Sequence, residues 1–213
     1  MSKQTVTEQQ IKIAIAVLKK GGIIAYPTDT VYGLGADPLN KHAVDKIYGV
    51  KKRPRSLALP LLLADKSDLL KVASVVPGIA WKLAERFWPG GLTLVLKKST
   101  WVPDTVSASG DTVAVRIPDH PVTIALIRGL GSPIVGTSAN LSGSPSPVTA
   151  AEVREQLGTE VDFIVDGGRC PGGVESTVLD ISGETPALVR EGAVPGKELE
   201  KFLGSTLPEK QDD

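Results

Sequence analysis

Four basic residues fall within five consecutive positions of this sequence, in the segment YGVKKRPRS at residues 48–56. Side chains of like charge repel one another unless water or an anion separates them, and these four are Lys51, Lys52, Arg53 and Arg55. In an extended segment, Lys51, Arg53 and Arg55 would share one side, because side chains alternate along the chain. Three charge-assisted hydrogen bonds at about 1.5–3 kcal/mol each would hold a triphosphate. The segment therefore predicts a site for a small polyanion, with a solvated surface run as the alternative.

Three loops rich in small polar residues could complete such a site. They cover residues 28–35, 137–147 and 166–176, and each follows a predicted strand. Ligands of open α/β sheets bind beyond the carboxyl ends of strands, where backbone N–H groups and short hydroxyls suit phosphate and carboxylate oxygens. No G-x-x-x-x-G-K-[ST] segment occurs, and no G-x-G-x-x-G segment follows a strand. The phosphate site must therefore be built from side chains, with Ser138 and Asn140 as neutral donors.

The sequence offers few reactive side chains. His42 and His120 lack metal-ligand spacing and are expected to be surface or capping residues. Cys170 is the only cysteine and is expected to be a bystander. Four carboxylates could contact Mg²⁺ or could equally be turn residues, and they are Asp29, Asp111, Asp166 and Glu175. The sequence therefore leaves the metal ligands unknown. Such a site suits nucleotidyl or phosphoryl transfer, which depends on alignment and charge stabilisation.

The elements that must position these residues alternate between helices and apolar strands. Helices are predicted near residues 7–20, 40–47, 66–87, 119–127, 149–157 and 196–203, and strands near residues 23–27, 57–64, 92–97, 112–118, 133–137, 162–165, 175–181 and 186–190. Thr7 and Gln10 are expected to form a capping box at the start of the first helix, and Gly49 is expected to end the second helix. The pattern predicts one α/β domain at residues 1–203, with a mixed sheet covered by helices and a flexible tail at 204–213.

The charge balance limits the partners of this chain. It has 24 basic and 24 acidic residues, whereas a protein that wraps nucleic acid usually carries a large positive excess. The polar N-terminus lacks a signal-peptide core, and the longest apolar run, residues 57–64, is too short to span a bilayer. We therefore expect a cytoplasmic protein that has no membrane contact and carries a local basic site.

Seven segments together resemble the YrdC-domain L-threonylcarbamoyladenylate synthases. In order they are GGIIAYPTDTVYGLGADP, KKRP, WPGGLTLVL, DTVAVRIPDHP, GTSANLSGSPSP, VDGG and GVESTVLD, and the resemblance covers about residues 10–203. The family's signature is a K-x-R segment and a distant S-x-N segment, both of which a sister branch of unclear function lacks. This chain matches the signature, and the resemblance assigns a catalytic role to the matching residues: Lys51, Arg53, Ser138 and Asn140. The resemblance implies a YrdC-like twisted mixed β-sheet flanked by helices, with a positively charged concave groove.

The same resemblance implies a reaction and its partners. L-threonine, bicarbonate or CO₂, and ATP, together with Mg²⁺, would give threonylcarbamoyl-AMP and pyrophosphate. The product would pass to a tRNA threonylcarbamoyltransferase for the N6-threonylcarbamoyl modification of adenosine 37 in tRNA. The implied threonine contacts are Thr28, Arg116, Gly136 and Ser176, with Arg116 on the carboxylate. The implied nucleotide contacts are Lys51, Arg53, Arg55, Thr112, Ser138, Asn140, Ser146 and Arg190.

Several alternatives stay open at this point. Arg116 could instead form a structural ion pair, and Arg190 could be an exposed strand end. Some members carry a histidine where this chain reads Leu61-Leu62-Leu63, which leaves a threonine contact from that strand open. The family's RPG after the last strand reads REG here, with Glu191 in place of proline. Longer members append a second domain, and the chain resembles the single-domain form. Two other functions also fit: an RNA-binding module of the same fold, with weak RNA binding in the groove, and a carbamoyl-adenylate-forming enzyme.

Overall fold

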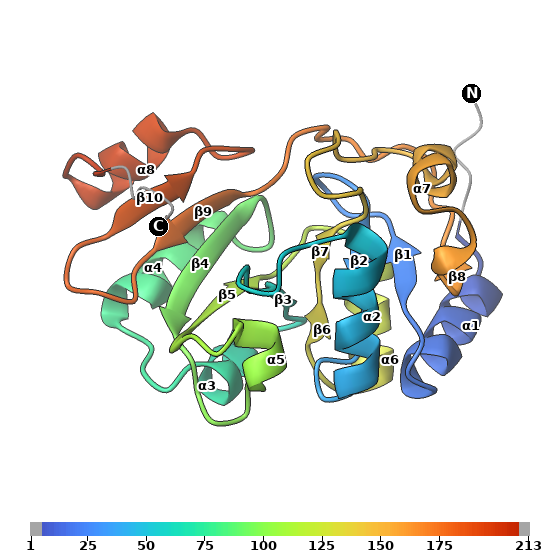
Figure 1. Ribbon diagram of the computed structural model, residues 1–213. Coiled ribbons are helices and arrows are strands. Elements are labelled where there is room, and N and C mark those ends of the chain that lie inside the picture. The colour runs from blue at the N-terminus through green and yellow to red at the C-terminus, as the bar shows by residue number, and fades with distance from the viewer. Residues whose placement is uncertain (1–5, 209–213) are drawn as a thin grey trace.

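The computed structural model describes residues 6–208 (Figure 1). Its helices are α1 (Glu8–Lys19), α2 (Lys41–Lys51), α3 (Leu69–Val72), α4 (Gly78–Phe87), α5 (Asp104–Ser107), α6 (Pro121–Leu130), α7 (Ala150–Leu157) and α8 (Gly196–Leu203), with 3₁₀ turns η1 (Lys66–Asp68) and η2 (Gly158–Glu160). Its strands are β1 (Ile24–Tyr26), β2 (Gly33–Gly35), β3 (Leu61–Leu62), β4 (Leu92–Lys97), β5 (Thr112–Arg116), β6 (Ile134–Val135), β7 (Thr137–Ser138), β8 (Phe163–Ile164), β9 (Thr177–Asp180) and β10 (Ala187–Arg190). The predicted mixed α/β class is confirmed.

The strands form two sheets, whereas the sequence predicted one. The first has the order β7-β2-β1-β8 and the second β10-β9-β4-β5-β3-β6. Both are mixed, since β1 pairs antiparallel with β2 and parallel with β8, while β4 pairs antiparallel with β5 and parallel with β9. Figure 1 shows most of the six-stranded sheet in the left half and the four-stranded sheet in the right half, with β6 beside β7 near the centre. Gly136 divides the strand predicted at 133–137 into β6 and β7, which belong to different sheets.

Two clusters of buried apolar side chains hold these layers together. The larger joins helices α2 and α4 to the six-stranded sheet, with members that include Ile47, Leu83, Leu94 and Val115. The smaller packs α1 and α6 onto β1, with members that include Leu18, Leu126 and Ile24. The predicted capping box begins α1: the backbone N–H of Gln10 donates to Thr7 Oγ1 at 3.2 Å, and the Thr7 N–H donates to Gln10 Oε1 at 3.1 Å.

Helix α2 continues past Gly49, where the sequence predicted its end. It runs to Lys51, and Lys52 caps it in the left-handed conformation with φ of 51°. One glycine costs a helix about 1 kcal/mol, and the burial of Ile47 and Tyr48 on the same helix outweighs that cost. Because Lys51 is helical and Lys52 left-handed, the basic segment is not extended, and the predicted alternation of its side chains is wrong.

Other boundaries also differ from the prediction. The strand predicted at 57–64 is reduced to β3, and the helix predicted at 66–87 is interrupted between α3 and α4, where Pro77 precedes α4. Residues 204–208, expected in a flexible tail, pack back on the fold: the Leu188 N–H donates to Pro208 O at 2.9 Å, and Leu207 lies against the larger apolar cluster. Residues 209–213 of that predicted tail lie outside the described residues. Among residues 6–208, no helix is long and apolar enough to cross a membrane.

Candidate functional site

A cavity of about 730 Å³ opens between the two sheets. That volume is in the range of small-molecule and cofactor sites. All twelve residues that the resemblance assigns to the site lie within the described part of the chain. Ten of them line the cavity, and they are Thr28, Lys51, Arg53, Thr112, Arg116, Gly136, Ser138, Asn140, Ser176 and Arg190. The other two, Arg55 and Ser146, are not among its lining residues.

The two signature pairs form one hydrogen-bonded unit at the end of α2. The Lys51 ammonium donates to Ser138 O at 2.5 Å, to Asn140 O at 2.8 Å and to Asn140 Oδ1 at 3.1 Å. Ser138 Oγ donates to the same Asn140 Oδ1 at 2.6 Å. Burial, assisted by the charge of Arg53, lowers the pKa of Lys51 to about 8. Lys51 therefore fixes the backbone of the S-x-N segment while it places a positive charge beside the cavity.

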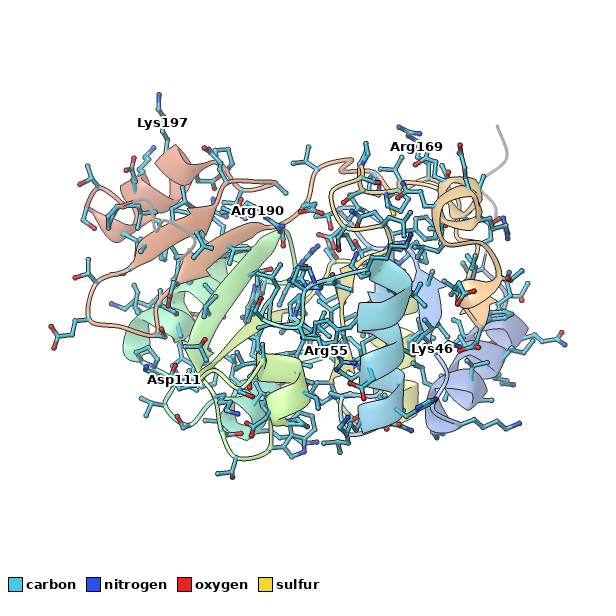
Figure 2. All side chains as sticks on the ribbon, in the orientation of Figure 1. Lys46, Arg55, Asp111, Arg169, Arg190 and Lys197 are labelled. Atoms are coloured by element: carbon cyan, nitrogen blue, oxygen red, sulfur yellow. The ribbon has the colours of Figure 1, made fainter. Side chains whose placement is uncertain are left out.

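Arg53 lines the cavity, whereas Arg55 turns away from it. The Arg53 guanidinium donates to Leu57 O at 3.2 Å and to Ala58 O at 2.9 Å, and burial lowers its pKa. Arg55 pairs with Asp45 at 2.5 Å, and its side chain is 65% exposed. Figure 2 labels Arg55 beside α2, the helix that carries Asp45. Arg55 points away from the cavity because the basic segment leaves the end of α2 through the left-handed Lys52 and is not extended. The nucleotide contact predicted for Arg55 therefore stays a prediction that this geometry does not support.

The loop after β7 is held in place by the Asn140 side chain. Its amide nitrogen donates to Leu141 O at 2.9 Å and to Ser144 O at 2.7 Å. Farther along this loop, Ser146 Oγ donates to Glu175 Oε1 at 2.5 Å. The hydroxyl of Ser146 is therefore joined to the cavity through a carboxylate that does line it.

Glu175 also forms an ion pair with Arg190, at the end of β10. Arg190 is held from its other side by Ser176 O, to which its Nε and Nη2 donate at 3.2 Å and 2.8 Å. Figure 2 shows Arg190 where the six-stranded half faces the other half of the molecule. Burial raises the pKa of Glu175, but the hydrogen bond from Ser146 and the charge of Arg190 outweigh it and leave the pKa below its ordinary value. The sequence interpretation considered Glu175 only as a metal ligand or turn residue and missed these contacts.

Arg116 combines the two roles that the sequence left open. Its guanidinium donates to Asp29 Oδ1 at 2.5 Å, to Thr30 Oγ1 at 2.9 Å and to Gly90 O at 2.8 Å. These contacts form a structural ion pair, and Arg116 also lines the cavity. A guanidinium has five N–H donors, so these three bonds leave two that are not paired in the described residues. Arg116 is therefore a rigidly oriented cation that could still bind a carboxylate.

The remaining predicted amino-acid contacts line the same cavity as Arg116. Thr28 Oγ1 donates to Val31 O at 2.7 Å, and Ser176 Oγ lies 2.8 Å from Thr93 Oγ1. A side chain at Gly136 would meet Leu62 Cγ at 2.3 Å, so glycine permits this close approach. Of the three leucines that follow the basic segment, Leu62 faces the cavity, while Leu61 and Leu63 belong to the larger apolar cluster.

The floor of the cavity is the face of the six-stranded sheet. It presents small apolar and hydroxyl side chains, namely Thr93, Val95, Thr112, Ala114, Val178 and Val189. Such a surface can pack against the flat face of a heterocyclic base without demanding hydrogen bonds. Arg116 on β5 and Asp180 on β9 add charges to the same face, because they alternate with Ala114 and Val178 along their strands.

Within residues 6–208, no group of three or more His, Cys, Asp or Glu residues could hold a metal ion. Of the four carboxylates considered from the sequence, only Glu175 lines the cavity; Asp29 pairs with Arg116 and Asp111 with Lys97. Mg²⁺ commonly binds through substrate phosphates and one or two carboxylates, so a metal that arrives with a nucleotide fits this donor set. Cys170 is buried, and burial raises its pKa to about 11, consistent with a bystander.

Comparison with known families and proteins links this cavity to a defined group. The Sua5_yciO_yrdC family model, described as "Telomere recombination", matches residues 16–192. The threonylcarbamoyl-AMP synthase of Pyrococcus abyssi is 43% identical over 202 residues, which are 95% of this chain and 59% of that protein. The Bacillus subtilis threonylcarbamoyl-AMP synthase is 45% identical over 198 residues, 92% of this chain and 57% of that protein. The chain thus spans less than two thirds of the length of these two relatives.

Solved structures agree with the sequence matches. The crystal structure of P. abyssi Sua5 complexed with L-threonine superposes with a TM-score of 0.93 at 42% identity, over 97% of this chain and 62% of that chain. The crystal structure of E. coli YciO has a TM-score of 0.80 at 33% identity, over 87% of this chain and 90% of that chain. The fold of residues 6–208 is therefore shared with proteins of this group.

Proposed function

The chain belongs to the Sua5/YciO/YrdC family, and we propose that it is an L-threonylcarbamoyladenylate synthase. It would convert L-threonine, bicarbonate or CO₂, and ATP into threonylcarbamoyl-AMP and pyrophosphate. The observation that carries this proposal is the unit formed by Lys51, Ser138 and Asn140 beside Arg53, on the wall of a nucleotide-sized cavity.

The cavity supports a specific placement of the substrates. The phosphates would lie against Lys51, Arg53 and Arg190, where the positive charges gather. The adenine would rest on the floor of the six-stranded sheet. The threonine carboxylate would meet Arg116, whose orientation is fixed by Asp29. The P. abyssi relative was crystallised with L-threonine, which supports an amino acid as one ligand of this fold.

The proposed chemistry needs no nucleophile from the protein. The threonine amine would add to CO₂ and lose a proton, which gives a carbamate. A carbamate oxygen would then attack the α-phosphorus of ATP and form a new P–O bond, while the bond to the β-phosphate breaks and pyrophosphate leaves. Lys51, Arg53 and Arg190 would offset the negative charge that builds on the phosphates. Mg²⁺ on the nucleotide would add further charge neutralisation.

The product is a mixed anhydride and therefore a reactive acyl donor. We propose that it passes to a tRNA threonylcarbamoyltransferase, as the family resemblance implies. Such a handoff fits a protein whose cavity opens between two sheets and whose own site contains few reactive groups.

The decisive experiment measures pyrophosphate release from ATP while threonine and bicarbonate are omitted in turn. Release that requires both substrates supports the proposal, and mass spectrometry should then detect threonylcarbamoyl-AMP. Arg53→Ala should reduce turnover by orders of magnitude, whereas Lys52→Ala should leave it near the original rate because Lys52 is exposed. Release that depends on carbamoyl phosphate instead of threonine, or RNA binding with a steep salt dependence and no pyrophosphate release, would contradict it.

A further inference from the structure

Glu175 places an acidic group among the predicted nucleotide ligands. One carboxylate oxygen accepts from Ser146 Oγ at 2.5 Å, and the other pairs with Arg190. Lys51 and Arg53 line the same cavity. Two of the groups assigned to the nucleotide are therefore already bound to a negative charge that belongs to the protein.

The backbone at Glu175 is held by close contacts with the segment before α8. The Ala193 N–H donates to Glu175 O at 2.8 Å, and Gly192 packs so closely that an added Cβ would lie 2.3 Å from the same oxygen. The Glu175 side chain is 31% exposed, which leaves it a path toward solvent. Rotation about its side-chain bonds would release both partners without a change in the backbone.

Arg190 would keep its position when the carboxylate leaves. Its Nε and Nη2 donate to Ser176 O at 3.2 Å and 2.8 Å, independently of Glu175. The guanidinium would then present Nη1, which now faces Glu175, to another anion. Ser146 would likewise regain a hydroxyl donor.

We propose that Glu175 is an internal counter-ion that occupies the anion site of the cavity and is displaced by the phosphates of the nucleotide. This inference rests on the proposed function, since it takes the ligand to be a polyphosphate. The carboxylate competes with every incoming anion, so a ligand with several charges displaces it more readily than a single phosphate does. The same competition favours departure of pyrophosphate, because the carboxylate returns to Ser146 and Arg190.

Calorimetric titration with inorganic pyrophosphate tests this role without any turnover. Glu175→Gln keeps the size and an acceptor oxygen but removes the charge, and it should bind pyrophosphate about tenfold more tightly, as expected when one charge-assisted competitor is lost. Glu160→Gln makes the same charge change at an exposed site on η2 and should bind like the unaltered protein. Unchanged or weaker binding by Glu175→Gln overturns the proposal.

A second measurement on the unaltered protein covers the case in which Glu175→Gln does not fold. In a crystal structure with bound pyrophosphate, the Glu175 carboxylate should have left both Ser146 and Arg190; if both contacts persist, the proposal is wrong. The two proposals can fail separately. Tighter binding by Glu175→Gln without pyrophosphate release from ATP refutes the synthase alone, and an active synthase with unchanged pyrophosphate binding refutes the counter-ion alone.

Discussion

Nucleotide binding should weaken above pH 8, because it depends on the charge of Lys51. The buried ammonium donates to three oxygen acceptors, and its pKa is lowered to about 8. The neutral amine has one donor fewer and no charge. From that pKa, about nine-tenths of the molecules carry the charge at pH 7 and about one-tenth at pH 9. The affinity for ATP should therefore fall about tenfold for each pH unit above 8.

The effect of the same group on folding has the opposite sign. The pKa of Lys51 is below its ordinary value of 10.5, so the folded state holds this proton less firmly than the unfolded state does. The resulting cost to stability, about 3 kcal/mol, is fully present below pH 8 and disappears as the pH rises through 10.5. Alkaline weakening of nucleotide binding at pH 8–9 would therefore not reflect unfolding caused by Lys51.

The assay should use a non-hydrolysable ATP analogue, because threonine and bicarbonate titrate in the same pH range. Calorimetry from pH 6.5 to 9.5 should show an affinity that begins to fall near pH 8 in the unaltered protein and in Lys52→Met. Lys51→Arg should lack this decline, since arginine stays charged. If Lys51→Arg does not bind the analogue, the ¹⁵N shift of the Lys51 ammonium should titrate near pH 8. An affinity that stays constant to pH 9.5 would refute the reasoning.

Three further substitutions test single contacts. Gly136→Ala should lower the free energy of unfolding by about 1–3 kcal/mol through overpacking. In chemical denaturation, the double variant with Leu62→Ala should lose less stability than the sum of the two single losses; additive losses would show that the clash lies elsewhere. Arg55→Ala should change the affinity for ATP by less than about twofold, whereas Arg53→Ala should weaken it strongly; a comparable loss in both would return Arg55 to the site. Glu191→Ala should cost about 1 kcal/mol of stability, because Glu191 accepts from the first backbone N–H of α8 at 2.8 Å. Glu191→Gln should retain most of that stability in the same denaturation experiment, and equal losses in both variants would contradict the capping role.

Much of the site could be predicted from the sequence, because the family signature depends on residue types. Lys51, Arg53, Ser138 and Asn140 all line one cavity, and the catalytic role that the resemblance assigns to them stays a prediction. Arg55 lies outside the cavity lining for a local reason: the segment expected to be extended begins at the end of a helix. A single glycine does not end α2, because the buried side chains on both sides of it stabilise the helix more than the glycine destabilises it.

The role of Glu175 could not have been predicted from local patterns. Its partners are 29 residues before it, at Ser146, and 15 residues after it, at Arg190. Pairings of this kind depend on which strands lie side by side, and the sequence predicted one sheet instead of two. The signal that was available was the position of Glu175 immediately before a conspicuous Ser-Thr pair in a predicted binding loop.

The passage of the chain through Gly136 has a mechanical consequence. The two short strands on either side of this residue belong to different sheets, and the same residue forms part of the cavity wall. A ligand bound beside Gly136 would contact residues of both sheets and would link the two halves of the molecule. The binding free energy would therefore add to the free energy needed to separate the two sheets, so the protein should become more stable as the cavity fills.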